Sequence, residues 1–390
     1  MLKILTYPDI DPQQWQALID RSPYATWFQT KEAYEFYASN PEEMTPFAFG
    51  VVEDECKVEG VKLKGEENGK ADTPASTLYT LHPTQNEAST PYTLHPTPTL
   101  KGVIVGYITK ERSALKQFFT RRAIIIGGPL LAEDATAEEI AALLSAVKKL
   151  QRSDLQPAGR STAKRSTGHS PIYIETRNFH DYSRWKEVFQ NAGFAYQPHY
   201  DIHVHCNATH TMSERRQREL KRAVKNGAKI VEASSEQEIR DWYQILSQIY
   251  RQKVRTPLWS KAFFLHFYRS EVGKYLLVKY QDKVIGGMMC PILNGRAIYE
   301  WYVCGLDEEY RDLYPSVMAT YAAIEYAKAN SLPLFDFMGA GKPDVPYGVR
   351  DFKAEFGGEL VEHGRFLCVR KPLLYWIGKM GVKWLKRSKR

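Results

Sequence analysis

The chain has 390 residues, of which 43% are hydrophobic and 25% are charged, which is typical of a soluble globular protein with two or three domains. No run of 18 apolar residues occurs, so no segment is expected to span a membrane, and the broken N-terminal stretch does not read as a signal peptide. The formal net charge is +8, but residues 371–390 hold five Lys, two Arg and no acid. The rest of the chain therefore carries a net charge of 8 − 7 = +1, which excludes a basic nucleic-acid-binding body. The five cysteines form no CxxC pair, which predicts reduced thiols in a cytoplasm and no metal site.

In chain order, the first predicted elements are two helices, a β-hairpin, a further strand, a helix and a closing strand. Their apolar spacing and turn residues predict these bounds. The ranges are 12–19, 31–38, 47–54 with 101–108, 122–129, 137–150 and 172–175.

A Thr- and Pro-rich insertion at residues 56–101 interrupts the first hairpin. Residues 75–84 recur almost unchanged as residues 88–97, and so short a repeat has no core of its own. A second segment, 152–170, is rich in Ser, Thr, Arg and Gly and predicts a linker. We therefore expect a mobile surface insertion and a connection between two folded bodies.

The same order of elements then appears a second time, from residue 236 onward. The ranges are 236–250, 260–268, 275–280 with 284–292, 296–302, 315–330 and 334–337. A doubled unit of helices, hairpin, strand, helix and strand predicts an α/β (α+β) protein with mixed sheets and two similar halves. The cleft between such halves is the expected ligand site.

Residues 335–358 combine a strand end, a glycine loop and a lone lysine between phenylalanines. Gly339 and Gly341 permit positive φ or close approach of a ligand. Lys353 follows Phe352, so its stem can lie along apolar surface while its ammonium meets a phosphate or a developing oxyanion. A half-buried structural lysine that ends in water is the alternative.

Three further side chains are candidates for the same cleft. Asp336, at a strand end, is suited to orient an amine or to accept its proton, although it would equally cap the glycine loop. Tyr299 and Tyr302 belong to an aromatic strand, of which one face is expected to line the cleft and the other to pack inside.

The segment 215–225 predicts a basic helix with six Arg or Lys residues. Arg216, Arg218 and Arg222 are its candidates for binding a phosphate-bearing acceptor or tRNA. A solvated charged helix face is the alternative.

Five motifs occur in order along the chain: residues 27–30 (WFQT), 122–129 (RAIIIGGP), 215–227, 335–339 (FDFMG) and 352–358 (FKAEFGG). Together with the doubled unit, they resemble the FemABX family of peptidoglycan interpeptide-bridge aminoacyltransferases and the broader FemAB-related GNAT proteins. The insertion lies outside this resemblance. The family's lysine after the first motif has no clear match, since Lys31 stands too early and Tyr37 is near the expected place.

The resemblance implies two tandem GNAT-like domains: a first domain at residues 1–165, completed by residues 359–390, and a second domain at residues 171–358. It implies transfer of an acyl or aminoacyl group to an amine of a lipid-linked or nucleotide-linked cell-wall precursor. Lys353 would then lie near the ester of the transferred group, and an arginine of the basic helix would bind the acceptor's diphosphate.

Neither strand-to-helix loop resembles a pyrophosphate loop for coenzyme A. Residues 305–315 carry four acids before the helix and no glycine pair, and residues 127–134 offer Gly-Gly-Pro followed by two acids. We therefore expect no bound cofactor and an aminoacyl-tRNA or other acyl donor in preference to acyl-CoA. The alternatives are a GNAT-fold N-acyltransferase of polysaccharide or lipid biosynthesis that uses acyl-CoA or acyl carrier protein, and a non-catalytic double-GNAT binding protein.

Residues 371–390 place Leu373, Trp376, Ile377 and Met380 at helical spacing among the basic residues. This pattern predicts an interfacial helix on an anionic membrane, with docking on the first domain as the alternative. We expect a cytoplasmic monomer, peripheral on the inner face of the cytoplasmic membrane.

Overall fold

The computed structural model describes residues 2–53, 98–110, 120–150, 170–207, 211–254 and 256–387. Most of the predicted insertion and the predicted linker lie outside these ranges. The last residues assigned to the insertion, 99–101, open a long strand instead, because they pair with the strand on the other side of the hairpin.

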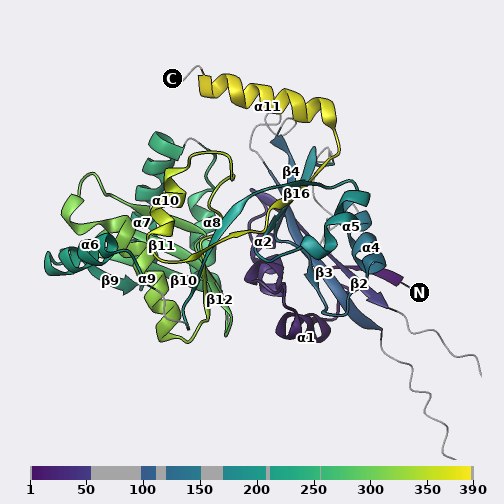
Figure 1. The fold of residues 1–390 in the computed structure, drawn as a ribbon, viewed down its shortest axis with the longest axis horizontal. Coiled ribbons are helices and arrows are strands. Elements are labelled where there is room, and N and C mark those ends of the chain that lie inside the picture. The colour runs from purple at the N-terminus through teal and green to yellow at the C-terminus, as the bar shows by residue number, and fades with distance from the viewer. Residues whose placement is uncertain are drawn as a thin grey trace, which may run out of the picture.

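The first sheet has eight strands. Their bounds are β1 Leu2–Thr6, β2 Met44–Glu53, β3 Thr99–Thr109, β4 Arg122–Gly127, β5 Leu130–Leu131, β6 Tyr173–Asn178, β7 Ala195–Gln197 and β16 Arg365–Val369. The order across the sheet is β1-β2-β3-β4-β6-β16-β7, with β5 beside β3. This sheet lies in the half of the molecule that holds the N-terminus (Figure 1). Within it, β4 and β6 form a parallel pair in an otherwise antiparallel sheet.

The second sheet also has eight strands. Their bounds are β8 Tyr200–His205, β9 Lys229–Glu232, β10 Gly273–Tyr280, β11 Lys283–Leu293, β12 Ala297–Tyr299, β13 Tyr302–Gly305, β14 Leu334–Asp336 and β15 Glu359–Glu362. The order is β9-β10-β11-β12-β14-β8-β15, with β13 beside β11 and β12 parallel to β14.

The two sheets match strand for strand, but their sixth strands are exchanged along the chain. After β7 the chain leaves the first sheet and enters the second as β8, and after β15 it leaves the second sheet and enters the first as β16. The two crossing segments lie side by side, since the N–H of Gly364 donates to the carbonyl of His199 at 3.2 Å. Each half is therefore completed by a strand from the other part of the chain.

This exchange divides the chain at residues other than those expected for the domains. Residues 173–197 belong to the first sheet, although they were assigned to the second domain at 171–358. Residues 359–362 belong to the second sheet, although they were assigned to the first domain's completion at 359–390. Only β16 and the C-terminal helix return to the first half.

Helices cover both sheets, and five of the ten described α-helices begin at a capping side chain. Their bounds are α1 Pro12–Arg21, α2 Lys31–Ala38, α4 Ala137–Lys148, α5 Lys186–Asn191, α6 Glu214–Lys225, α7 Glu236–Ile249, α8 Lys261–Ser270, α9 Pro315–Ala329, α10 Gly348–Ala354 and α11 Pro372–Arg387. Asp11, Thr30 and Ser235 each accept a backbone N–H at the start of a helix, as N-cap residues do. None of these described helices is long and apolar enough to cross a bilayer.

Aromatic side chains join the two halves in one core. Trp27 and Phe28, from the first half, pack against Trp301 with ring centroids 5.7 and 5.2 Å apart, and Phe28 also meets Tyr299 at 5.4 Å. Such pairs contribute about 0.5–1.5 kcal/mol each beyond the area they bury. The halves therefore share a continuous hydrophobic core.

Candidate active site

The predicted strand at 296–302 is broken in the structure, and the break opens the second sheet. β12 pairs with β14, but β13 pairs only with β11, so the chain separates from β14 after Glu300, whose N–H still donates to the carbonyl of Asp336 at 2.9 Å. The side chains of Glu300 and Lys353 meet beside this break.

Lys353 is buried, and its ammonium is fully used by protein acceptors. Its Nζ donates to the carbonyls of Phe337 at 2.8 Å and Gly339 at 2.9 Å, and it forms an ion pair with Glu300 Oε1 at 2.8 Å. Three donors meet three acceptors, so no N–H remains for a transferred group in this structure. In this structure Lys353 holds the glycine loop against β12. This agrees with the alternative of a structural lysine, except that its ammonium is bound by protein acceptors and not by water.

Sequence reasoning missed Glu300. It is buried, and this burial raises the pKa of its carboxyl, an effect that the charge of Lys353 opposes. A single acid between Tyr299 and Trp301, in an aromatic strand, was the available signal, because a buried charge requires a partner.

Asp336 lies beside two residues of β8 that the sequence did not single out. Asp201, His203 and Asp336 are all buried, and their ligand atoms lie within 4.8 Å of one another. His203 Nε2 and Asp336 Oδ2 are 3.4 Å apart, an ion-pair distance without hydrogen-bond alignment. We call these three residues the acid–base cluster. Asp201 and His203 alternate along one strand, which is the pattern that points two polar side chains to the same face.

Backbone groups fix both carboxylates of the acid–base cluster. Asp336 Oδ1 accepts the N–H of Met338 at 2.6 Å, so it caps the glycine loop as the alternative interpretation held. Asp201 Oδ1 accepts the N–H groups of Ile202 and Gly339, each at 2.7 Å. The second oxygen of each carboxylate is left to face the cluster.

The pKa values of the three residues in the cluster are shifted in different directions. Burial and the adjacent charge of Asp336 raise the pKa of Asp201 well above its ordinary range. Burial opposes ionisation of Asp336 as well, but the charge of His203 and hydrogen bonds outweigh it and lower the pKa of Asp336. Burial lowers the pKa of His203, yet the nearby carboxylates raise it to about 9. The surroundings therefore favour the protonated form of Asp201, the ionised form of Asp336 and the charged form of His203.

Three more histidines surround this cluster, so four of the ten in the chain gather here. The rings of His203 and His363 are 5.2 Å apart, and His363 belongs to the crossing segment before β16. Burial lowers the pKa of His180 and of His199 to about 4, and it lowers the pKa of His363 as well. These neighbours are uncharged imidazoles at neutral pH.

Two arginines of the first sheet face the cluster across the seam between the halves. Arg177 and Arg365 share one carboxylate, that of Glu175, at 3.2 and 3.0 Å. Burial lowers the pKa of Arg365, and the charge of Arg177 lowers it further. The two arginines thus carry one positive charge more than Glu175 neutralises. Both arginines line a narrow hollow with Asp201 and Gly339 of the second half.

The glycine loop needs its glycines for backbone reasons. Gly339 and Gly341 have φ of +128° and +83°, which L side chains rarely adopt. A Cβ on Gly341 would also lie 2.7 Å from Tyr347. The carbonyl of Gly341 accepts the N–H of Tyr200 at 2.8 Å, which fixes the loop to the crossing segment.

The two candidate tyrosines have different surroundings. Tyr299 is 1% exposed and stacks on Phe179 inside the shared core. Tyr302 is half-buried and lies 6.2 Å from the ring of Tyr250, in the π-helical turn Tyr250–Val254. Tyr302 therefore lies beside Tyr250, which lines a surface hollow, whereas Tyr299 is packed inside.

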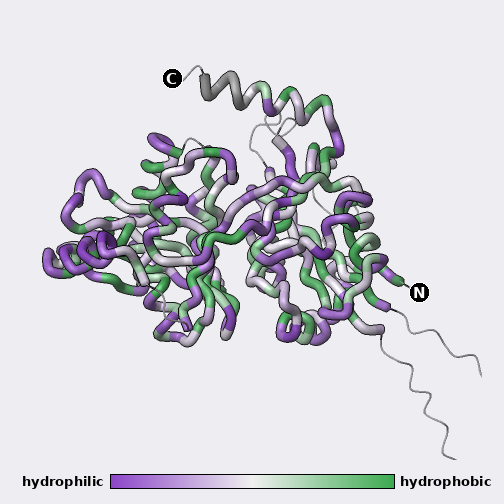
Figure 2. Tube along the Cα trace, in the orientation of Figure 1, coloured by the Kyte–Doolittle hydropathy of each residue, from purple (hydrophilic) through white to green (hydrophobic). Residues whose placement is uncertain are grey.

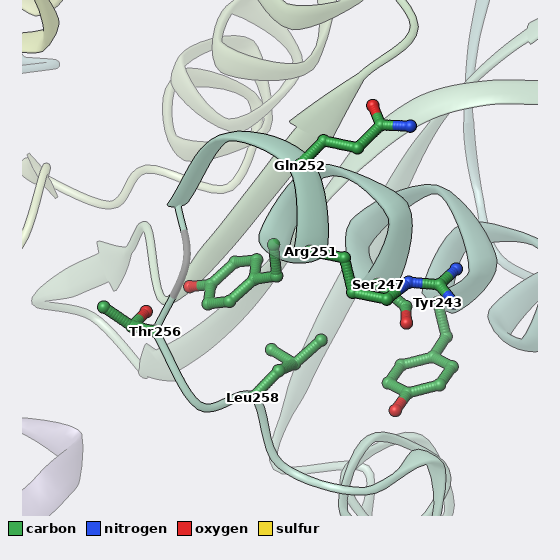
Figure 3. A pocket seen from close by; sticks show the side chains of 7 residues that line it. Tyr243, Ser247, Arg251, Gln252, Thr256 and Leu258 are labelled. Atoms are coloured by element: carbon green, nitrogen blue, oxygen red, sulfur yellow. The ribbon is translucent and has the colours of Figure 1, made fainter. Parts of the chain in front are cut away.

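That hollow has a volume of about 740 Å³ and opens beside the end of α7. Figure 3 shows its lining side chains, which come from α7, the π-helical turn and the segment before α8. They are Tyr243, Ser247, Tyr250, Arg251, Gln252, Thr256 and Leu258. A π-helical turn within a helix often accompanies a functional site.

The arginines of α6 lie away from the seam, on the outer side of the second half (Figure 1). Arg216 is buried, forms ion pairs with Glu219 and Glu355, and lies 4.3 Å over the ring of Phe352. Arg218 pairs with Glu214 at 3.6 Å and Arg222 with Asp312 at 2.8 Å. The structure does not bring these predicted substrate-binding residues, or Phe352, to the acid–base cluster.

Both helix N-termini that would hold a diphosphate in a coenzyme A enzyme are closed by acidic side chains. In the second half, Asp307 accepts the N–H of Ser316 at 2.9 Å at the start of α9. In the first half, Thr136 and Glu139 form a capping box at the start of α4. A carboxylate in these positions takes the place of a phosphate and repels one.

The acid–base cluster is also the one group among the described residues with three or more metal-ligating side chains close together. It offers one nitrogen and two oxygens.

The comparisons with known proteins agree with this geometry. A family model described as an acetyltransferase (GNAT) domain matches residues 212–353. These residues form a GNAT acyltransferase domain. No curated protein matches the chain.

The solved structure of FemX extends the resemblance of fold over both halves of the chain. FemX superimposes with a TM-score of 0.59 at 12% identity, covering 96% of this chain and 99% of that one. A tandem GNAT protein from the clavulanic acid biosynthesis pathway gives 0.48 at 9%, covering 94% and 98%. L-PGS from Bacillus licheniformis gives 0.47 at 12%, covering 72% and 85%. The prediction of a doubled GNAT-like fold that resembles the FemABX fold is confirmed.

Proposed function

We propose that this GNAT acyltransferase transfers an acyl or aminoacyl group from a donor other than coenzyme A, such as aminoacyl-tRNA, to an amine of a cell-envelope precursor. The contact of Asp307 with the N-terminus of α9 carries the proposal, because it closes the position that would bind the coenzyme A diphosphate. The fold of FemX supports a lipid-linked or nucleotide-linked acceptor. The free thiols of the four described cysteines support a cytoplasmic location.

In this proposal the acid–base cluster handles the proton of the amine. The amine nitrogen attacks the ester carbonyl of the donor, and the ester C–O bond breaks. The amine proton passes to Asp201, whose own proton passes to Asp336, and the same route returns a proton to the leaving oxygen. His203 keeps Asp336 ionised beforehand, which makes it a positioning residue.

Arg177 and Arg365 have a separate role, which is to hold an oxyanion of the acceptor at the seam. Their side chains are 32% and 27% exposed, and both form an ion pair with Glu175. Guanidinium groups bind carboxylates and phosphates in a bidentate manner, so a phosphate or carboxylate near the reacting amine matches this pair.

The second candidate function is N-acylation from acyl-CoA or acyl carrier protein, which the description of the matched family model favours. Calorimetric titration with acetyl-CoA separates the two. We expect no saturable binding up to about 1 mM, because a site without its phosphate contacts retains about 4 kcal/mol at most. Asp307→Ala is the matched variant, since it reopens the N-terminus of α9. Micromolar binding by the unaltered protein would favour the second candidate.

A further inference from the structure

The C-terminal helix α11 projects from the body of the protein (Figure 1). It touches the first half through Tyr375, whose ring meets that of Tyr173 edge-on at 5.4 Å. Leu374, Tyr375 and Gly378 are its half-buried residues on this side. The rest of the described part of the helix faces outward.

The outward face of α11 is apolar. Leu373, Trp376, Ile377 and Met380 are 71%, 61%, 39% and 47% exposed, and their spacing of 0, 3, 4 and 7 residues forms one stripe. Figure 2 shows hydrophobic residues along this projecting helix. Four of the ten large hydrophobic side chains exposed in the described chain thus lie within eight residues, where a soluble surface would bury or disperse them.

The same segment carries unbalanced positive charge. Residues 371–390 contain five Lys, two Arg and no acid. In the described part, neither Lys371 nor Lys379 forms an ion pair with an acid, and Lys379 lies over the ring of Tyr375. The basic helix α6 is different, since its arginines pair with acids and it exposes one large apolar side chain, Val224.

We propose that α11 is an interfacial helix that docks the protein on an anionic lipid surface. An exposed apolar stripe enters the acyl boundary, while lysines and arginines beside it meet the negative headgroups. A protein partner for the stripe alone would not require the excess of positive charge. The proposal stands on exposure and charge and does not depend on the chemistry of the acyl transfer.

The position of α11 fits a lipid-linked acceptor, a corollary that rests on the proposed function. Strand β6 begins at Tyr173, under α11, and reaches Arg177 at the seam. Four residues of strand span about 13 Å. A headgroup at the docked surface is therefore within reach of the arginine pair.

Co-sedimentation with vesicles tests the docking. The full chain is mixed with phosphatidylcholine vesicles that contain about one third phosphatidylglycerol, or none. We expect the unaltered protein to bind the anionic vesicles and to bind the neutral ones at least tenfold more weakly. Two variants, the double substitution Trp376→Ser with Ile377→Ser and the single substitution Lys379→Glu, should each bind the anionic vesicles tenfold more weakly than the unaltered protein. These positions are exposed, so the fold is retained, as circular dichroism will verify.

The matched control is Val224→Ser with Lys221→Glu on α6, which removes an equally exposed apolar and basic pair. It should bind as the unaltered protein does. Equal binding by the α11 variants, equal binding to neutral vesicles, or no binding at all would overturn the proposal. The proposal would also be overturned if the protein self-associated without lipid and the Trp376→Ser variant abolished this association, because the stripe would then bind a second copy of the chain.

Discussion

A chain that ends after Gly364 is expected to lose its folded first half, whereas a chain that ends after Lys371 is expected to fold as the full chain does. The shorter chain lacks β16, which lies between β6 and β7. It also loses Phe366, which is 1% exposed and stacks on Phe189 at 4.0 Å. Burial of one such side chain contributes about 1.5–3 kcal/mol, and a whole central strand exceeds the 5–15 kcal/mol of a typical domain's stability.

Near-UV circular dichroism and limited proteolysis of the two truncated chains distinguish these outcomes. The chain that ends after Lys371 is the control, because it lacks only α11 and the residues beyond it. A native near-UV spectrum for the chain that ends after Gly364 would show that the exchanged strand is dispensable. For the same reason, residues 171–358 are not expected to fold alone, since they include strands of the first sheet.

Lys353→Ala is expected to destabilise the protein by about 3–5 kcal/mol, the cost of removing one partner of a buried ion pair. The substitution leaves Glu300 buried without its counter-charge and two carbonyls, of Phe337 and Gly339, without a donor. The glycine loop that they fix also carries the N–H bound to Asp201. Activity should therefore fall together with stability.

Urea unfolding measures this effect, with Lys342→Ala as the control, because Lys342 lies exposed in the same loop region. Adding Glu300→Gln to Lys353→Ala removes the unpaired charge and should restore part of the loss. An unchanged urea midpoint combined with abolished turnover would instead show that Lys353 acts on the substrate directly.

Local patterns in the sequence were sufficient to predict most elements. The helix expected at 315–330 is α9 at Pro315–Ala329, and the hairpin expected at 275–292 is β10 with β11. The strand exchange was not predictable in this way. Strands β8 and β16 have ordinary alternating patterns, and their choice of sheet depends on contacts between residues 129 or more positions apart.

For the same reason, only part of the candidate site was predictable from the sequence. Asp336 and Lys353 stood out in a glycine-rich stretch, but Asp201, His203 and Glu300 become significant only when the fold brings them to these two residues. The arginines of α6 show the reverse case. Their spacing suggested phosphate binding, but acids on the same and neighbouring segments neutralise them.

The central claim is that the acid–base cluster supports acyl transfer to an envelope precursor, and mass spectrometry of the lipid- and nucleotide-linked precursors tests it most directly. Cells that lack the protein are complemented with the unaltered chain or with Asp336→Asn, which keeps the shape of the side chain and removes its charge. We expect an acylated or aminoacylated precursor that disappears without the protein, returns with the unaltered chain, and falls about 100- to 10,000-fold with Asp336→Asn, the usual contribution of a general base. Identical precursors in all cells, or full restoration by Asp336→Asn, would contradict the account.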